Sequence, residues 1–265
     1  MMLVCIRGAG DIASGIALRL SRSRIKVIMT EIEKPLTVRR TVSFSEAVRL
    51  GACSVEGVPA KLAHDSQEAI ALSEKNIIPV IISPDGKYIR EIKPAAVVDS
   101  IMAKRNLGTK ITDAHTVIGV GPGFTVGTDC HAVIETKRGH NLGRAIYGYG
   151  MTAERNTGIP GNICGYTSER LLRAPCEGVF IPRHDIGDIV RAGEIVATVN
   201  GENITAEIDG LIRGLLAPGI FVERGMKAGD IDPRGESADC HKVSDKALAV
   251  GGGVLEALLH FRCLM

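Results

Sequence analysis

The chain has 265 residues, enough for one large or two modest domains, and an apolar fraction of 45% can supply a proper core. Its net charge is +2 with acids and bases interspersed, so no overall field draws it to nucleic acid or to a membrane surface. Aromatic residues make up 3% and tryptophan is absent, which argues against base-stacking platforms and aromatic sugar binding.

The seven cysteines are an odd number, and no two of them form a C-x-x-C pair. This spacing favours neither a disulfide framework nor a structural zinc site, and we expect no metal. Free thiols are typical of a reducing compartment. We find no signal peptide and no apolar stretch long enough to cross a bilayer, so the sequence predicts a cytoplasmic protein.

The first thirty residues have the order of a dinucleotide-binding unit. The apolar run 3–6 is typical of a buried parallel strand, and apolar residues at helical spacing follow between Ile12 and Leu20. A second apolar run, 25–29, leads to Glu31. Strand, glycine turn, helix, strand and acid predict a Rossmann-like fold.

The small residues of the glycine turn have distinct roles in that fold. Gly8 permits the tight turn, Gly10 admits a pyrophosphate close to the backbone, and Ala13 lets helix and strand pack closely. Glu31 lies 21 residues after Gly10, where a carboxylate accepts a ribose 2′-hydroxyl. The cofactor-binding residues predicted here are Gly8, Ala9, Gly10, Asp11, Ile12, Ala13 and Glu31, and the predicted ligand is NAD(P) or another nucleotide.

The alternative is a Rossmann-like unit whose pocket is empty or binds something else. Asp11 favours this alternative a little, because a carboxylate at a helix start competes with phosphate for the same N–H groups.

Alternating strands and helices continue through residues 1–110, which we expect to form an open α/β sheet. Ser43 and Glu46 predict a helix that ends at Gly51, and Asp65 predicts the cap of a helix over 66–75. The remaining predicted elements are an extended piece at 54–62, strands at 77–82 and 95–98, and a hairpin arm at 88–92.

Three further residues of this region are candidates for ligand binding. Asp99 follows a predicted strand at the carboxyl edge, where α/β sheets place ligands. Arg39 and Arg40 could hold a second anionic group, although two arginines on a loop are more often only surface residues.

From residue 111 the chain is expected to be rich in β-structure. A strand at 117–120 runs into a loop where Gly121 and Gly123 could form a nest of N–H groups for a phosphate or carboxylate. The alternative is a β corner that requires positive φ. Strands are also predicted at 132–136 and 142–149, before a polar loop over 151–167.

Four candidate catalytic residues crowd this part: Asp129, His131, Glu135 and His140. His131 and Glu135 share strand parity, so both could point to one face as an acid/base pair or as metal ligands. The alternative is a solvated strand with polar rims, which we favour slightly because the spacing matches no metal motif.

Residues 174–233 contain an internal repeat in which the glycines at 178, 187 and 193 recur 32 residues later at 210, 219 and 225. Such paired β units resemble the barrel-sandwich hybrid of lipoyl and biotinyl domains. The tip of that domain would be at 200–203 and has no lysine for attachment. We expect turns with positive φ at the repeated glycines.

A terminal helix is predicted over 244–262, with an apolar stripe that includes Val250, Val254 and Leu258. Glycines 251–253 in its middle lower the stability of a helix, and such residues indicate close packing against another backbone, a loop or a ligand. Cys240 lies beside His241 and is a candidate nucleophile or a selenium or metal contact. The alternative is a spectator cysteine, because neighbours in an extended segment point to opposite faces.

Several runs together match a known family: Arg7 to Gly15, Val120 to Phe124, His131 to Thr136, Arg138 to His140, and Gly251 to Ala257. The chain resembles the YqeB-type maturation proteins of selenium-dependent molybdenum hydroxylases over nearly its whole length. The resemblance implies an accessory protein with a molybdenum hydroxylase as client, and it carries over no catalytic residues.

Together these features predict two domains: a Rossmann-like nucleotide-binding domain at 1–110, and a β-rich domain at 111–265 with the barrel-sandwich repeat and the terminal helix. The predicted role is maturation of a molybdenum hydroxylase through a bound nucleotide or nucleotide-bearing molybdenum cofactor. The alternatives are an NAD-dependent oxidoreductase and a non-enzymatic scaffold that docks the client. A homo-oligomer is compatible with either role.

Overall fold

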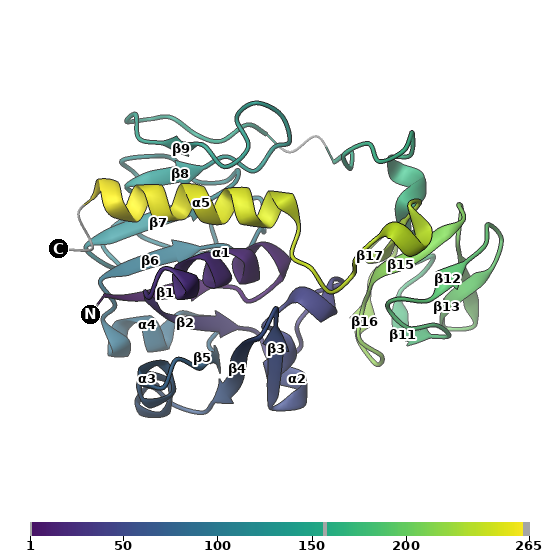
Figure 1. Ribbon diagram of the computed structural model, residues 1–265, viewed down its shortest axis with the longest axis horizontal. Helices are drawn as coiled ribbons and strands as arrows, with labels where there is room; N and C mark the ends of the chain where they lie inside the picture. Colours follow the sequence, from purple (N-terminus) through teal and green to yellow (C-terminus); the bar gives the residue numbers. More distant parts are fainter. Residues whose placement is uncertain (1, 156–157, 262–265) are drawn as a thin grey trace. The chain divides into compact units, whose positions relative to one another are not determined.

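The computed structural model describes residues 2–155 and 158–261, and the chain divides into two units whose segments interleave (Figure 1). Unit 1 comprises residues 1–35, 43–157 and 243–265, and unit 2 comprises residues 36–42 and 158–242. The predicted domain boundary after residue 110 falls within unit 1, between two strands that pair with each other. Among the described residues, no helix has the length and apolar character needed to span a membrane.

Unit 1 is built on a nine-stranded sheet with the order β3-β4-β5-β2-β1-β6-β7-β8-β9. Its strands are β1 (Leu3–Arg7), β2 (Lys26–Glu31), β3 (Ala52–Val55), β4 (Val58–Ala63), β5 (Ile78–Ile82), β6 (Ala96–Asp99), β7 (Thr116–Val120), β8 (Ala132–Ile134) and β9 (Ala145–Ile146). The strands from β4 across to β8 pair in parallel, while β3 and β9 are antiparallel to their neighbours. The sheet is therefore mixed.

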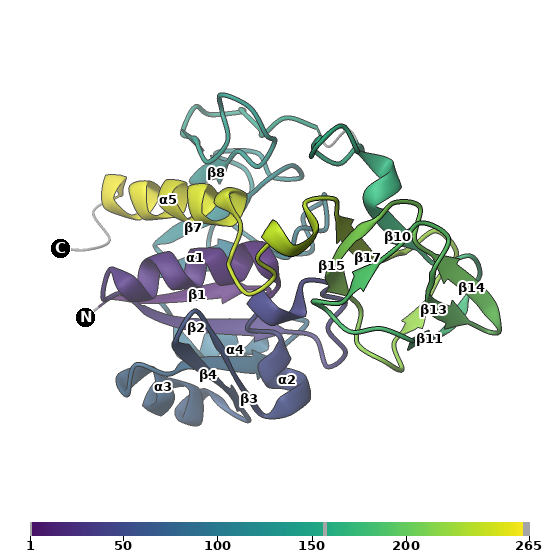
Figure 2. The ribbon, with the colours of Figure 1, turned by 45° about the vertical axis from the view of Figure 1, so that its right-hand side comes forward.

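The helices of unit 1 are α1 (Asp11–Arg22), α2 (Glu46–Leu50), α3 (Ser66–Glu74), α4 (Lys87–Ile92) and α5 (Asp245–His260). Helices α1 and α5 lie side by side (Figures 1 and 2). Glycines make this approach possible: a Cβ on Gly15 would lie 2.5 Å from the Ala247 Cβ, and one on Gly251 would lie 3.0 Å from the Gly15 carbonyl oxygen. The predicted terminal helix and its close backbone packing at Gly251 are confirmed.

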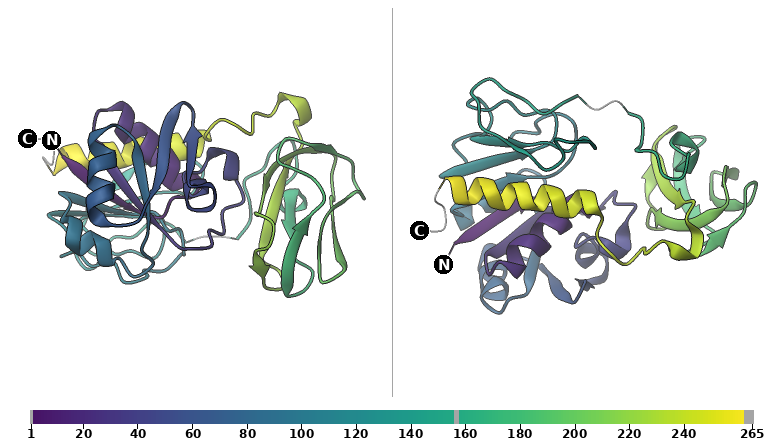
Figure 3. Two further views of the ribbon diagram at one scale, coloured as in Figure 1. Left: turned by 90° about the horizontal axis from the view of Figure 1, so that it is seen from below. Right: turned by 45° about the horizontal axis from the view of Figure 1, so that its top comes forward.

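Unit 2 contains two four-stranded antiparallel sheets, β10-β17-β15-β12 and β14-β13-β11-β16, around one apolar core (Figure 3). Its strands are β10 (Leu171–Arg173), β11 (Gly178–Pro182), β12 (Ile189–Val190), β13 (Ile195–Val199), β14 (Glu202–Thr205), β15 (Gly210–Leu215), β16 (Phe221–Val222) and β17 (Lys227–Asp232). Three 3-10 turns complete it: η1 (Arg40–Val42), η2 (Ser168–Arg170) and η3 (Gly235–Ser237). Segment 36–42 joins this unit because the Val38 carbonyl accepts the Leu215 N–H at 2.7 Å.

The predicted fold class is wrong in both parts. A Rossmann-like domain needs helical crossovers between its parallel strands. Here β6, β7 and β8 are joined by irregular segments, and α5 packs against β7, β8 and β9 instead. The repeat 174–233 does not form the predicted barrel-sandwich hybrid as a self-contained unit either, because one of its two antiparallel sheets is completed by β10, from outside the repeat.

Predictions of single caps and turns are confirmed where one residue determines the local backbone conformation. The Asp65 carboxylate accepts the Glu68 N–H at 2.7 Å and begins α3. The predicted hairpin arm at 88–92 is wrong, because these residues form α4. The repeated glycines all have positive φ, as predicted: 178, 187, 193, 210, 219 and 225.

Candidate functional site

The parallel strands of unit 1 end at a common edge, which we call the carboxyl edge. Strand β1 leads there into Gly8, β2 ends at Glu31, and β6 ends at Asp99. Further along the same edge, β7 leads into Gly121 and β8 into Glu135. Ligands of parallel sheets bind outside this edge. The fold thus gathers most of the predicted site residues along one side of one sheet.

The space left by two of the predicted ligand-binding glycines is filled by the protein itself. Gly8 has φ +93, and a Cβ there would lie 2.8 Å from the Ser100 carbonyl oxygen. Gly123 has φ +109, and its Cβ would lie 2.6 Å from the Arg105 Cα. Gly121, with φ +79, adjoins Thr136. We call residues 100–106, which lie against Gly8 and Gly123, the wedge segment.

Gly10 differs from these glycines. It is the N-cap of α1, with φ −72 and ψ −172, a conformation open to any residue. Its backbone geometry therefore does not explain the glycine. Gly10 has no side chain that could cap α1, and the positive end of the helix dipole lies at this start, where it favours an anion. Ile12 and Ala13 continue the first turn of α1, where Ala13 is buried.

Glu31 is fixed against the glycine turn. Its carboxylate accepts the Ala9 N–H and the Ile32 N–H, each at 2.9 Å. Burial raises the pKa of Glu31 above its ordinary value, and these two N–H groups act in the opposite direction. The Glu31 carboxylate thus lies at the glycine turn as predicted, and its hydrogen-bond donors there are backbone N–H groups of the protein itself.

Asp99 is buried within a hydrogen-bonded cluster. Its Oδ2 lies 3.3 Å from Arg7 Nη1 and accepts the Thr109 hydroxyl at 2.5 Å, while Oδ1 accepts the Ile101 N–H at 3.1 Å. Both Arg7 and Asp99 are less than 5% exposed. These contacts anchor the wedge segment at the end of β6.

The predicted pair His131 and Glu135 lies at opposite edges of the sheet. His131 precedes β8 and accepts the Val117 N–H through Nδ1 at 3.0 Å. Glu135 follows β8, so four residues of extended chain, about 13 Å, separate the two. Burial, followed by the neighbouring His115, lowers the pKa of His131. The two side chains therefore cannot share a proton.

Asp129, Glu135 and His140 have different surroundings. Asp129 accepts the Thr125 N–H at 2.8 Å and the Asn106 amide at 3.0 Å, which ties its loop to the wedge segment. Glu135 is buried and accepts the N–H groups of Thr136, Lys137 and Glu154 at 2.7–2.8 Å. His140 is exposed on a loop.

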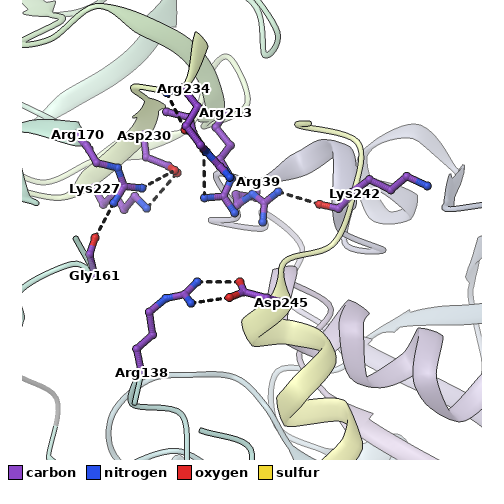
Figure 4. A network of polar contacts seen from close by, with 11 residues as sticks. Arg39, Arg138, Gly161, Arg170, Arg213, Lys227, Asp230, Arg234, Lys242 and Asp245 are labelled. Carbon is purple, nitrogen blue, oxygen red and sulfur yellow. Dashed lines mark hydrogen bonds and ion pairs between the residues drawn. The ribbon is translucent and has the colours of Figure 1, made fainter. Parts of the chain in front are cut away.

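The remaining candidates lie in unit 2. Arg39 donates to the Lys242 carbonyl at 3.1 Å (Figure 4), and Arg40 donates to the Leu215 carbonyl at 2.7 Å. Cys240 is buried beside Leu211 and Ala238. The structure thus does not bring these three residues together with the glycine turn within one unit.

Lys246 is a residue that sequence reasoning missed. It lies in the first turn of α5, next to the Ala247 that packs on Gly15 of α1. Burial and then Arg138 lower its pKa, while the carboxylates of Asp11, Glu135 and Asp245 act in the opposite direction. The available signal was its position, because a cation in the first turn of a helix opposes the helix dipole.

Arg138 completes this group. Its guanidinium donates to both carboxylate oxygens of Asp245, at 2.7 and 2.9 Å (Figure 4). The arrangement joins the loop after β8 to the start of α5. Within residues 2–155 and 158–261, no group of three His, Cys, Asp or Glu side chains could hold a metal ion.

Comparisons with known proteins give one strong match in sequence, whereas the matches to solved structures have TM-scores below 0.3. No family model matches the chain. An uncharacterised protein named YqeB, from Escherichia coli (strain K12), is 54% identical over 257 residues, which are 97% of this chain and 47% of that protein. The chain spans about half the length of this curated relative. The match supports the YqeB family.

The similar solved structures have low scores. An aspartoacylase family protein from Mesorhizobium loti is 13% identical, with a TM-score of 0.27 over 87% of this chain and 84% of that one. The ectoine utilization protein EutE from Ruegeria pomeroyi is 18% identical, with a TM-score of 0.23 over 33% of this chain and 27% of that one. At such scores the likeness assigns neither fold nor activity.

Proposed function

We propose that this chain is an accessory protein for the maturation of a selenium-dependent molybdenum hydroxylase. In that role it binds a nucleotide, or a nucleotide-bearing molybdenum cofactor, at the carboxyl edge of unit 1. The identity to YqeB and the motifs that resemble the maturation proteins support the role. The molybdenum cofactor is cargo in this proposal and belongs to the client hydroxylase.

One observation carries the ligand class: the starts of α1 and α5 meet at the carboxyl edge. Gly15 on α1 touches Ala247 on α5, which places the first turns of both helices beside each other. Two aligned helix dipoles present their positive ends there, together with the ammonium group of Lys246. This arrangement favours an anionic group such as a phosphate.

The nucleoside part of the ligand would lie towards Glu31. Its carboxylate stands 2.9 Å from the Ala9 N–H of the glycine turn, and a carboxylate at that place accepts a ribose hydroxyl. A 2′-phosphate would instead be repelled. We therefore expect NAD to bind more tightly than NADP, and the reverse order would remove Glu31 from the site.

The test is calorimetric titration of the purified chain with NAD, NADP, ATP and cytidine nucleotides. Gly10→Val places a side chain where the phosphate would lie without straining the backbone, and should abolish binding. Lys246→Gln should weaken binding about tenfold through the lost charge. Lys75→Gln, an exposed lysine after α3, is the matched control. Absence of binding by the unmodified chain to every nucleotide would refute the ligand class.

The client half of the proposal is tested separately. Native mass spectrometry of freshly purified chain should retain a nucleotide-bearing ligand, and affinity capture should recover a molybdenum hydroxylase. Retention of NAD with hydride-transfer turnover would identify an oxidoreductase instead. Capture of the hydroxylase by a chain that binds no ligand would identify a docking scaffold.

A further inference from the structure

The wedge segment has an unusual backbone for residues with side chains. Met102 has φ +64 and Lys104 has φ +62, two left-handed residues of three. Ala103 between them does not have positive φ, so φ alternates in sign along the segment. Alternation of this kind turns successive N–H groups towards one side and forms a concavity that binds anions.

The N–H groups of the wedge segment have no acceptor among the residues that the structure describes. None of the five N–H groups from Met102 to Asn106 donates a hydrogen bond to any residue in 2–155 or 158–261. The two N–H groups that precede this run do have acceptors: Ser100 donates to the Arg7 carbonyl, and Ile101 donates to Asp99.

A buried hydroxyl group lies at the start of the same segment. Ser100 is 3% exposed, and its Oγ has no hydrogen-bond partner in the described part of the chain. Buried hydroxyl groups nearly always have a partner, which is a protein group, a water or a ligand. An oxygen of a bound anion would supply one.

Two cations belong to the segment, and the nearby carboxylates are already engaged. Lys104 and Arg105 are exposed, and neither side chain has a hydrogen bond or ion pair within the described ranges. Asp99 is bound to Arg7 and Thr109, and Asp129 is bound to Asn106 and the Thr125 N–H. The charge presented by the wedge segment is therefore positive.

We propose that the wedge segment is a further phosphate-binding element of this chain, in addition to the helix starts, and that it holds a pyrophosphate or polyphosphate group. Its backbone N–H groups and Ser100 would donate to the phosphate oxygens, while Lys104 and Arg105 neutralise their charge. Gly8 and Gly123 then contribute indirectly: because they have no side chains, the wedge segment can pack against them. The proposal rests on the proposed nucleotide function for the remainder of the ligand, because it assigns only the phosphate contacts.

The experiment titrates the chain calorimetrically with inorganic pyrophosphate and with ATP at low ionic strength. The double variant Lys104→Gln/Arg105→Gln should bind at least tenfold more weakly. Ser100→Ala, which preserves volume, should weaken binding about tenfold, as expected for a hydrogen bond to a charged group. The matched control is Arg24→Gln/Lys75→Gln, which removes the same two charges from exposed positions after α1 and α3.

Each outcome decides between the two proposals, and the variants are judged on whichever probe binds. Weaker binding by the double variant with an unchanged control supports the assignment. Equal binding by the double variant and the control overturns it and leaves the nucleotide function standing. Binding of pyrophosphate but not of ATP, weakened by the double variant, supports the assignment and excludes only ATP as the nucleotide. Failure of the unmodified chain to bind either probe overturns the assignment, while the nucleotide function is decided by the titration with NAD, NADP and cytidine nucleotides.

Discussion

The two edges of the unit 1 sheet differ in how they use polar groups. The opposite edge, where the parallel strands begin, is the amino edge. Aromatic rings pack against one another there: His131, Tyr147, His260 and Phe261. The ring centroids of Tyr147 and His260 are 4.1 Å apart in a stacked arrangement. The Tyr147 hydroxyl there donates to Glu256 at 3.0 Å. At the carboxyl edge, five successive N–H groups of the wedge segment lack an acceptor within residues 2–155 and 158–261. The amino edge fastens α5 to the sheet, whereas the carboxyl edge keeps donors available.

The largest expected effect concerns the anchor beneath the wedge segment. Asp99→Ala should lower the free energy of unfolding by about 3–5 kcal/mol, because it leaves the Arg7 guanidinium buried without its carboxylate. Urea denaturation followed by circular dichroism measures the change. The double variant Arg7→Met/Asp99→Leu should recover most of the loss. If Asp99→Ala cost less than about 1 kcal/mol, the cluster would not be an anchor.

A smaller effect is expected at the glycine that seats the segment. Gly8→Ala should cost about 2–3 kcal/mol, since it combines positive φ with a clash against the Ser100 carbonyl. Gly108→Ala provides the control, because Gly108 has φ +96 but no atom lies within 4 Å of the place its Cβ would take, and it should cost about 1 kcal/mol. Thermal unfolding compares them, and equal losses would show that the contact with Ser100 contributes nothing.

The smallest effect concerns the amino edge and depends on pH. The pKa of His131 is lowered, so the unfolded chain takes up this proton first as pH falls below about 6.5. The free energy of unfolding should therefore decrease in that range, by less than about 1 kcal/mol because the ring is partly exposed. His131→Asn keeps an acceptor for the Val117 N–H without titrating. Denaturation at about pH 7.5 and about pH 5.5 should show a smaller difference for this variant; an unchanged difference would assign the effect to other groups.

The sequence predicted what depends on neighbouring residues. The cap at Asp65, the terminal helix after Ser244 and the positive φ of Gly178 and Gly210 follow from short-range geometry, and all are present. The strands that end at the carboxyl edge also lie where the sequence predicted strands: β1, β2, β6, β7 and β8. Each of these features is encoded within a few residues of where it occurs.

What the sequence did not predict depends on contacts between distant segments. The glycine turn at 8–10 matched a dinucleotide motif, yet Gly8 is required by Ser100, more than ninety residues away. His131 and Glu135 share parity, but strand length places them at opposite edges. Lys246 lies at the site only because α5 packs on α1. Arg39 and Arg40 belong to unit 2, where they donate to the carbonyl groups of Lys242 and Leu215 respectively. No local pattern carries this information.

The position of α5 in the chain also has a consequence for biosynthesis. Helix α1 is complete at residue 22, whereas α5, which covers its Gly15 face, begins at residue 245. At about 5–20 residues per second, a ribosome needs on the order of 10–40 s to make the intervening chain. Throughout that interval the Gly15 face of α1 lacks the helix that covers it. Helix α1, one of the first elements to be synthesised, is thus among the last to be covered.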